Sequence, residues 1–135
     1  MSHFSVLSTA LTDTDALCAA LADVGYREVE VHDTAQPLHG YRGDRREHTA
    51  HVIVRRRHVG RLSNDIGFLH GEDGRFTAAI SDYDRRRHDA AWLDRLTARH
   101  AYHVTAARLA EEGFHLAEET TERDGTVRMV LRRVR

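Results

Sequence analysis

A six-residue pattern occurs twice in the sequence, and each copy marks the end of a helical stretch. Leu21-Ala22-Asp23-Val24-Gly25-Tyr26 resembles Leu109-Ala110-Glu111-Glu112-Gly113-Phe114. In both copies a segment with apolar residues at helical spacing ends at a glycine, and the segment that follows alternates apolar and polar residues as a strand does. Each half, 1–60 and 61–135, is therefore predicted as strand, helix, strand, strand. A chain of 135 residues supports one core, so we expect a single domain with weak internal duplication.

The remaining periodicity gives an expected order of elements. It predicts strands over 4–11, 26–32, 49–56, 66–70, 75–81 and 114–121, a last strand carrying Val127, Met129 and Leu131, and helices over 13–25 and 89–112. The segment 33–47 contains Pro37, two glycines and a charged run, and is predicted as a long loop.

Two such units predict an α+β fold, a ferredoxin-like antiparallel sheet with both helices on one face. The other face of that sheet would be uncovered. Ile53, Val130 and Val134 are expected to point toward it. Self-association or a bound partner is the expectation that follows from such a face.

Composition excludes several classes of function. The 20 arginine and lysine residues are balanced by 21 acidic residues, so neither general nucleic-acid binding nor attachment to a membrane surface is expected. No apolar stretch approaches the roughly 18 residues of a membrane span. The first residues lack the features of a signal peptide, which predicts a cytoplasmic protein. The single Cys18 excludes a multi-cysteine metal site.

The tetrad Arg-Arg-Arg-His occurs twice, each time at the boundary of a predicted element. The first copy is Arg55, Arg56, Arg57 and His58, and the second is Arg85, Arg86, Arg87 and His88. If the copies approach in space, they would bind phosphate or carboxylate. The alternative is a solvated strand edge that blocks edge-to-edge pairing, with nearby aspartates neutralising the second copy.

The glycine-flanked loop around Tyr41 and Arg42 is a further candidate for anion or partner binding. Its backbone amides could face a phosphate, but it lacks the Gly-Lys-Ser/Thr ending of a nucleotide-binding loop.

The long helix carries the residues of a possible catalytic or metal site, namely Arg99, His100, Tyr102 and His103. Two histidines three residues apart can share a metal ion. His103 falls on the apolar stripe that includes Leu96 and is expected to point into the core, whereas His100 is expected on the flank. We therefore predict packed residues, no stoichiometric metal and no cofactor.

Several separate blocks resemble a known family. They are Met1-Ser2-His3-Phe4-Ser5, Gly25-Tyr26, Leu38-His39-Gly40-Tyr41-Arg42-Gly43, Asn64-Asp65-Ile66-Gly67-Phe68, Arg99 to Tyr102, Gly113-Phe114 and Asp124-Gly125. In this order they resemble domain of unknown function 1257, which includes the conserved reading frame thirty-five of cyanobacteria and chloroplasts. The resemblance spans essentially the whole chain. It implies a small soluble accessory protein, often encoded near AAA-type ATPases, and it supplies no catalytic residues. The histidine and arginine enrichment departs from the plant-type pattern and argues against a photosynthetic role.

Two hypotheses follow. The first is a non-catalytic accessory protein that docks on a partner, an AAA-type ATPase or its substrate, through the sheet face, the 33–47 loop and the arginine tetrads. The alternative is a small enzyme with a pocket between helix and sheet, in which a histidine acts as general base or metal ligand and an arginine binds an anionic substrate.

Overall fold

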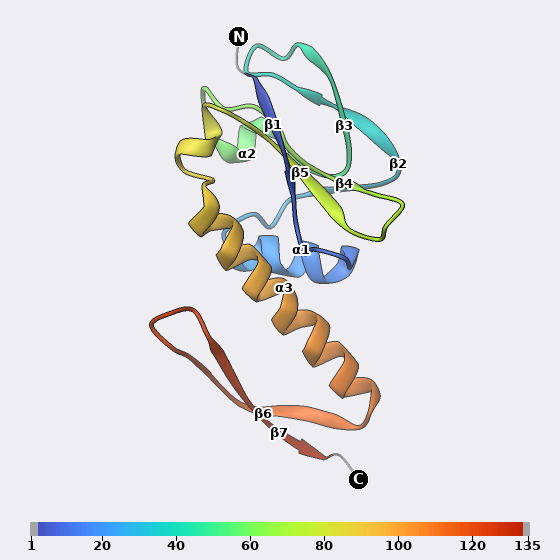
Figure 1. Cartoon of the computed structure of the whole chain (residues 1–135), viewed down its shortest axis with the longest axis vertical. Helices are drawn as coiled ribbons and strands as arrows, with labels where there is room; N and C mark the ends of the chain where they lie inside the picture. Colours follow the sequence, from blue (N-terminus) through green and yellow to red (C-terminus); the bar gives the residue numbers. More distant parts are fainter. Residues whose placement is uncertain (1–2, 134–135) are drawn as a thin grey trace.

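The computed structural model describes residues 3–133 and combines a five-stranded sheet, a two-stranded sheet and two main helices (Figure 1). The elements are β1 (Phe4–Ser8), α1 (Thr14–Asp23), β2 (Glu30–His39), β3 (Arg45–Val54), α2 (Arg56–Val59), β4 (Ile66–His70), β5 (Phe76–Ser81), the 3-10 turn η1 (Asp84–Arg86), α3 (Ala90–Glu111), β6 (Phe114–Thr121) and β7 (Val127–Arg133).

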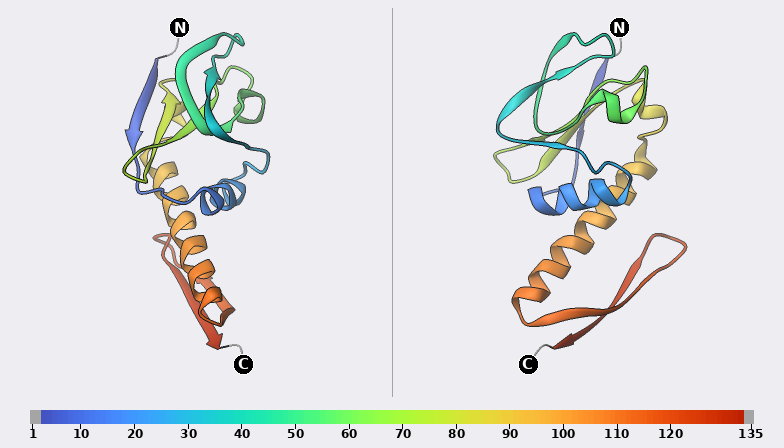
Figure 2. Two further views of the ribbon diagram at one scale, coloured as in Figure 1. Left: turned by 90° about the vertical axis from the view of Figure 1, so that its right-hand side faces the viewer. Right: turned by 180° about the vertical axis from the view of Figure 1, so that it is seen from behind.

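The main sheet has the order β1-β5-β4-β3-β2, and every neighbouring pair is antiparallel. Helix α1 and the first half of α3 pack against the same face of this sheet (Figure 2). The core between them consists of Leu11, Leu17, Ala20, Leu21, Val52, Val54, Ile66, Phe68, Phe76, Ala78, Ile80, Trp92 and Leu96. These findings confirm the α+β class, the antiparallel pairing and the shared face of the two helices.

The last two strands form a sheet of their own, which corrects the prediction of one sheet built from both units. Helix α3 has 22 residues and is therefore about 33 Å long, more than the strands beneath it can cover. Its second half extends beyond the sheet, and the β6–β7 hairpin folds back beside it (Figures 1 and 2). The ferredoxin-like detail is not confirmed by this strand order.

The segment predicted as a long loop is mostly strand. Strand β2 runs on to His39 and β3 begins at Arg45, so only a tight turn separates them. Pro37 lies within β2, at the end of the sheet order. Proline has no N–H to donate, and an edge strand tolerates this loss.

The second face of the sheet carries a small apolar cluster, which corrects the expectation that Ile53 is uncovered. Ile53 is fully buried and packs with Leu38, Ala50 and Ala79. Gly67 permits this packing, because a Cβ there would lie 2.7 Å from Leu38 Cδ2. Beyond this cluster, Val130 is 48% exposed but lies on β7, outside the main sheet. Val134 lies outside the described residues.

Both main helices begin at an aspartate cap. The side chain of Asp13 accepts a hydrogen bond from Ala16 N at the start of α1, and Asp89 accepts one from Trp92 N at the start of α3. None of the described helices is long and apolar enough to cross a membrane.

Candidate functional site

The face of the main sheet opposite the helices exposes apolar side chains on the β1–β5–β4 side. Val6 is 58% exposed and Leu69 is 36% exposed. Together with Glu47, His48, Thr49, Thr77 and Ala79 they line a shallow hollow of about 240 Å³. We call these seven residues the open sheet face.

One polar atom on the open sheet face lacks a partner. His48 Nδ1 is buried and makes no hydrogen bond within residues 3–133, although the ring packs at a tilt against Phe4 with 5.2 Å between centroids. Buried polar atoms are almost always hydrogen-bonded, so this nitrogen is an exception.

The β1 edge beside the open sheet face carries no charge. Strand β1 has the sequence Phe-Ser-Val-Leu-Ser and pairs only with β5 among the described strands. Edge strands that stay unpaired usually carry charged residues or proline, which prevent pairing with another chain. The β1 edge lacks these residues.

The first arginine tetrad is divided between the interior and the surface. Arg55 donates to both carboxylate oxygens of Glu30 at 2.8 Å and to Asp65 Oδ2 at 2.7 Å. The hydrogen bonds from Arg55 hold the pKa of Glu30 down at about 2, and the hydrogen bond to Glu30 raises the pKa of Arg55. Arg55 is therefore already neutralised within the protein.

The other members of this tetrad have different partners. The Arg56 side chain donates to the carbonyls of Ser63 at 3.1 Å and Arg61 at 3.0 Å. His58 lies 3.3 Å from a Glu28 carboxylate oxygen. Arg57 is exposed and forms no hydrogen bond or ion pair with the rest of the described chain.

A buried Asn64-Asp65 pair connects the segments around both tetrads. The Asp65 carboxylate is inaccessible to solvent and accepts hydrogen bonds from the backbone N–H groups of His39 at 2.6 Å and Arg56 at 2.7 Å. Asn64 Oδ1 accepts from Tyr41 N at 2.9 Å. Sequence reasoning missed this pair as a structural centre, although both residues stand in a block that carries the family resemblance.

The same pair fixes the Tyr41–Arg42 turn. Besides Tyr41 N, the amides of Gly40 and Gly43 donate to Asp44 and Gly40 carbonyls at 2.8 Å each. These three amides are therefore not free to contact a phosphate. Arg42 lies over the Tyr41 ring, 5.3 Å from its centroid.

The second tetrad is likewise divided. His88 is buried, and its Nε2 accepts from the Tyr26 hydroxyl at 2.5 Å while its Nδ1 donates to the Asp84 carbonyl at 3.1 Å. Burial lowers the pKa of His88. Arg86 donates to the Tyr83 carbonyl at 3.2 Å and stacks on that ring.

The tetrads do not combine into one patch. Arg86, Arg87 and His88 line a hollow of about 390 Å³ whose opposite wall is the 60–63 loop. That loop contributes Arg61, which sequence analysis did not select, and no member of the first tetrad lines the hollow.

The two histidines of α3 are oriented opposite to the prediction. His100 is 4% exposed, and its Nε2 accepts from the backbone N–H groups of Thr12 at 3.2 Å and Asp13 at 3.1 Å. His103 is half-exposed and donates to Asp23 at 2.6 Å. The buried line of α3 follows four-residue steps through Trp92, Leu96 and His100, because α3 packs across α1 along that ridge.

His103, Arg99 and Tyr102 belong to a polar cluster that joins α1, α3 and β6. Arg99 donates to Asp23 at 2.9 Å and to Glu119 at 3.1 Å, and its guanidinium lies 4.3 Å from the centroid of the Tyr102 ring. Although burial alone would raise the pKa of Asp23, hydrogen bonds from His103 and Arg99 lower it. The five side chains of this cluster, which include Asp23 and Glu119, are thus held by one another.

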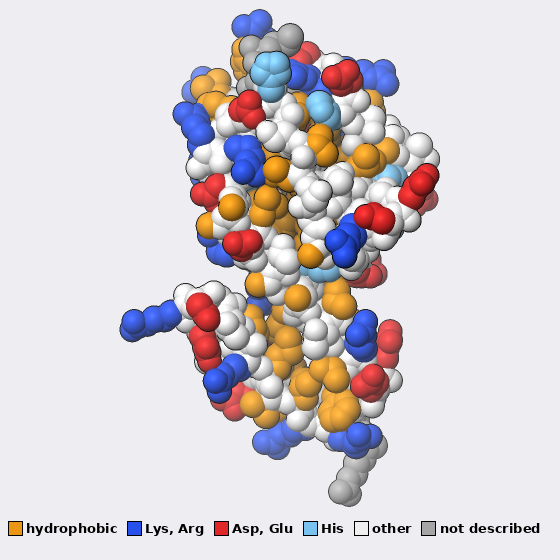
Figure 3. Space-filling view, in the orientation of Figure 1, with side chains coloured by type: hydrophobic (Ala, Val, Ile, Leu, Met, Phe, Trp, Pro, Cys, Tyr) orange, Lys and Arg blue, Asp and Glu red, His pale blue; other side chains and the backbone are white. Residues whose placement is uncertain are grey.

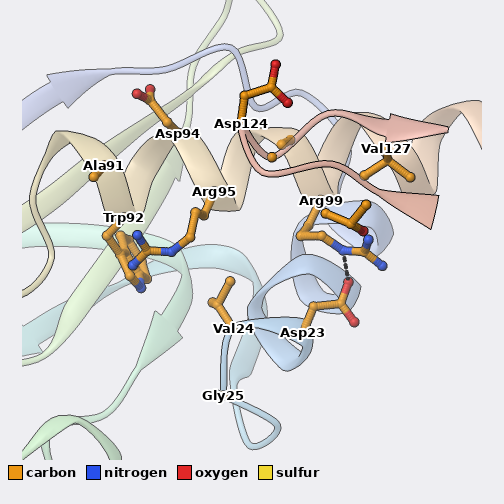
Figure 4. Close-up of a pocket in the computed structure, with 13 residues that line it drawn as sticks. Asp23, Val24, Gly25, Ala91, Trp92, Asp94, Arg95, Arg99, Asp124 and Val127 are labelled. Atoms are coloured by element: carbon orange, nitrogen blue, oxygen red, sulfur yellow. Dashed lines mark hydrogen bonds and ion pairs between the residues drawn. The ribbon is translucent and has the colours of Figure 1, made fainter.

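A groove of about 760 Å³ lies between the end of α1, α3 and the tip of the β6–β7 hairpin (Figure 4). Arg99 and Asp23 stand at one end, and Trp92 and Arg95 line another part. Neither His100 nor His103 lines it. Within residues 3–133 no group of three or more histidine, cysteine or acidic side chains is placed to hold a metal ion.

Residues 20–130 match the family model described as protein of unknown function DUF1257. The chain belongs to this family. Three relatives share the name uncharacterized protein ycf35. That of Guillardia theta is 29% identical over 100% of this chain and 99% of its own length. Those of Cyanophora paradoxa, at 24% identity over 100% and 99%, and Pyropia yezoensis, at 22% over 98% of both chains, are similar to it over the same extent. No solved structure matches the chain.

Proposed function

We propose that this member of the DUF1257 family is a non-catalytic, cytoplasmic accessory protein that docks on a partner protein through the open sheet face. The partner that the family resemblance favours is an AAA-type ATPase or a protein on which it acts. The observation that carries the proposal is the exposure of the apolar side chains of Val6 and Leu69 on this face.

Docking on this face would bury apolar surface that is now exposed to solvent. Burying a valine or leucine side chain contributes about 1.5–3 kcal/mol, and Val6 and Leu69 both have area left to bury. The uncharged β1 edge adds backbone groups to which a strand of the partner could bind.

An arginine-rich flank offers a second contact region. It consists of the exposed or half-exposed side chains of Arg61, Arg85, Arg86 and Arg87. Figure 3 shows basic side chains, interspersed with acidic ones, along the side of the upper body where the 84–86 segment lies. Such a flank would steer an acidic partner surface and set its orientation more than it would add affinity.

The enzyme hypothesis finds less support in the geometry. His100 is engaged by two backbone donors, and His103 and Arg99 both pair with Asp23. A general base must reach a substrate proton, and the large groove is not lined by either imidazole.

Photo-crosslinking in the native host tests the docking proposal. A photoreactive amino acid replaces Val6 in one variant and Val31 in a matched control, because Val31 is 53% exposed on β2 and outside the open sheet face. We expect a discrete crosslinked protein from position 6 and none from position 31, with an AAA-type ATPase, another protein or a second copy distinguished by mass spectrometry. Equal yields at both positions, or none at position 6, would contradict docking on this face.

A further inference from the structure

The hollow between the 60–63 loop and the η1 turn is lined by three guanidinium-bearing residues, Arg61, Arg86 and Arg87. Its volume is about 390 Å³, within the range of small-molecule sites. We call it the arginine pocket. None of the three side chains forms an ion pair within residues 3–133, in contrast to Arg55, which pairs with both Glu30 and Asp65.

The walls of the arginine pocket are fixed to each other. Asn64 N donates to Asp84 Oδ2 at 2.9 Å, and Ser81 Oγ donates to the same oxygen at 2.7 Å. Asn64 follows the loop and Asp84 begins η1, so these bonds join the two walls through buried residues. The loop is also held from behind by Arg56, which donates to the Arg61 and Ser63 carbonyls.

One of the three arginine side chains, that of Arg86, is positioned before any ligand arrives. Arg86 is held by the Tyr83 carbonyl at 3.2 Å, and its guanidinium lies 4.2 Å from the Tyr83 ring centroid. A side chain that is already ordered loses less conformational freedom when it binds.

The charge of the pocket is unbalanced. Asp84 is the single acidic residue in its lining, and this residue is 3% exposed, with its carboxylate engaged by Asn64 and Ser81. Burial keeps the pKa of His88, on the pocket floor, below its usual value, so the positive charge comes from the arginines. Three guanidinium-bearing residues that line one hollow can match the several oxygens of a phosphate group.

We propose that the arginine pocket binds the phosphate group of a small phosphorylated molecule, with Arg61, Arg86 and Arg87 as its ligands. The arginine pocket shares no residue with the open sheet face, so a failure to bind phosphate would leave the proposal of docking through that face unaffected.

Titration of the purified full-length chain with inorganic phosphate, pyrophosphate and glucose 6-phosphate tests this inference, with binding followed by calorimetry and by the arginine Nε–H signals in NMR spectra. Saturable binding of at least one probe is expected at constant ionic strength. Tighter binding of the sugar phosphate than of free phosphate would identify an organic monoester as the ligand, and the reverse order would identify the free anion.

Three variants and one control locate the site. Arg61→Gln, Arg86→Gln and Arg87→Gln are each expected to weaken binding roughly tenfold, because each removes a charge-assisted hydrogen bond. Arg57→Gln removes an arginine that is exposed like those of the pocket and forms no side-chain hydrogen bond or ion pair within residues 3–133, but does not line the pocket. This control should leave the affinity for the phosphate probes unchanged. The Arg61 side chain makes no hydrogen bond or ion pair within residues 3–133. Arg61→Gln can therefore still test phosphate binding if Arg86→Gln is unstable. Non-saturable binding, or an equal loss in Arg57→Gln, would overturn the proposal.

Discussion

Arg55 and Asp65 form an ion pair of 2.7 Å in which the carboxylate is completely buried. Arg55 follows the end of β3 and Asp65 precedes β4, and the same carboxylate accepts the backbone N–H of His39 at the end of β2. One charged pair therefore fixes the ends of three strands. Removing one partner of a buried pair leaves the other charge without compensation.

Asp65→Asn is expected to lower the free energy of unfolding by about 3 kcal/mol, because two backbone donors and Arg55 lose their charged acceptor. Urea unfolding followed by the fluorescence of Trp92 measures this change. Asp82→Asn is the control, since Asp82 is exposed and its side chain accepts one surface hydrogen bond, from Ser5. A similar loss in both variants would show that Asp65 has no special structural role.

Stability should fall as the pH drops below 6.5. Burial lowers the pKa of His100 from 6.5, so the unfolded chain binds the proton first and is favoured as the pH decreases. His100→Gln should reduce the slope of stability between pH 7 and 5, while His115→Gln, at an exposed position of β6, should preserve it. An unchanged slope in His100→Gln would contradict the assignment of a neutral, hydrogen-bonded imidazole.

Glu30 acts in a lower pH window. Its pKa falls from 4.5 to about 2 in the folded protein, so the stability it contributes is present above pH 4.5 and is lost as the pH falls toward 2. Glu30→Gln should flatten the acid unfolding curve in that window, measured by circular dichroism. Glu72→Gln, at an exposed position of the β4–β5 turn, is the control, and equal flattening in both would contradict the role of the Arg55 pair.

The β6–β7 hairpin should open independently of the main sheet. The residues of β6 after Phe114 are all exposed, and Glu119 connects the strand to α3 through Arg99. Backbone amides in weakly packed elements exchange with solvent by local opening. Glu119→Gln should speed exchange across β6 and β7 without affecting β3 to β5. Glu118→Gln, one residue away and with no side-chain hydrogen bond or ion pair within residues 3–133, should not. Uniform acceleration in all strands would indicate global unfolding instead.

The elements predicted well from the sequence are those specified by neighbouring residues. The caps of the two main helices, Asp13 and Asp89, are the residues at which the predicted ranges start. Gly25 and Gly113, the glycines of the repeated pattern, follow the helix ends with φ values of 109° and 89°. Such signals act within a few residues, so they do not depend on the rest of the fold.

Features that depend on packing between residues far apart in the sequence were not predicted. Pro37 is part of a strand because β2 lies at the edge of the sheet, and the residues around Pro37 do not show this position. His100 and His103 both fall near the apolar stripe of α3, and the crossing of α3 over the start of α1 decides which is buried. Arg61 joins the arginine pocket through the Asn64–Asp84 hydrogen bond, between residues 20 positions apart.

The most direct measurement of the central claim is the affinity of the purified chain for the partner captured at position 6. Val6→Asp places a charge on the open sheet face, and Val31→Asp places the same charge on an equally exposed valine of β2. We predict that Val6→Asp weakens binding at least tenfold, as expected for about 1.4 kcal/mol or more of lost apolar burial, and that Val31→Asp binds like the wild type. Unchanged affinity in Val6→Asp, with its fold intact by circular dichroism, would contradict docking through this face.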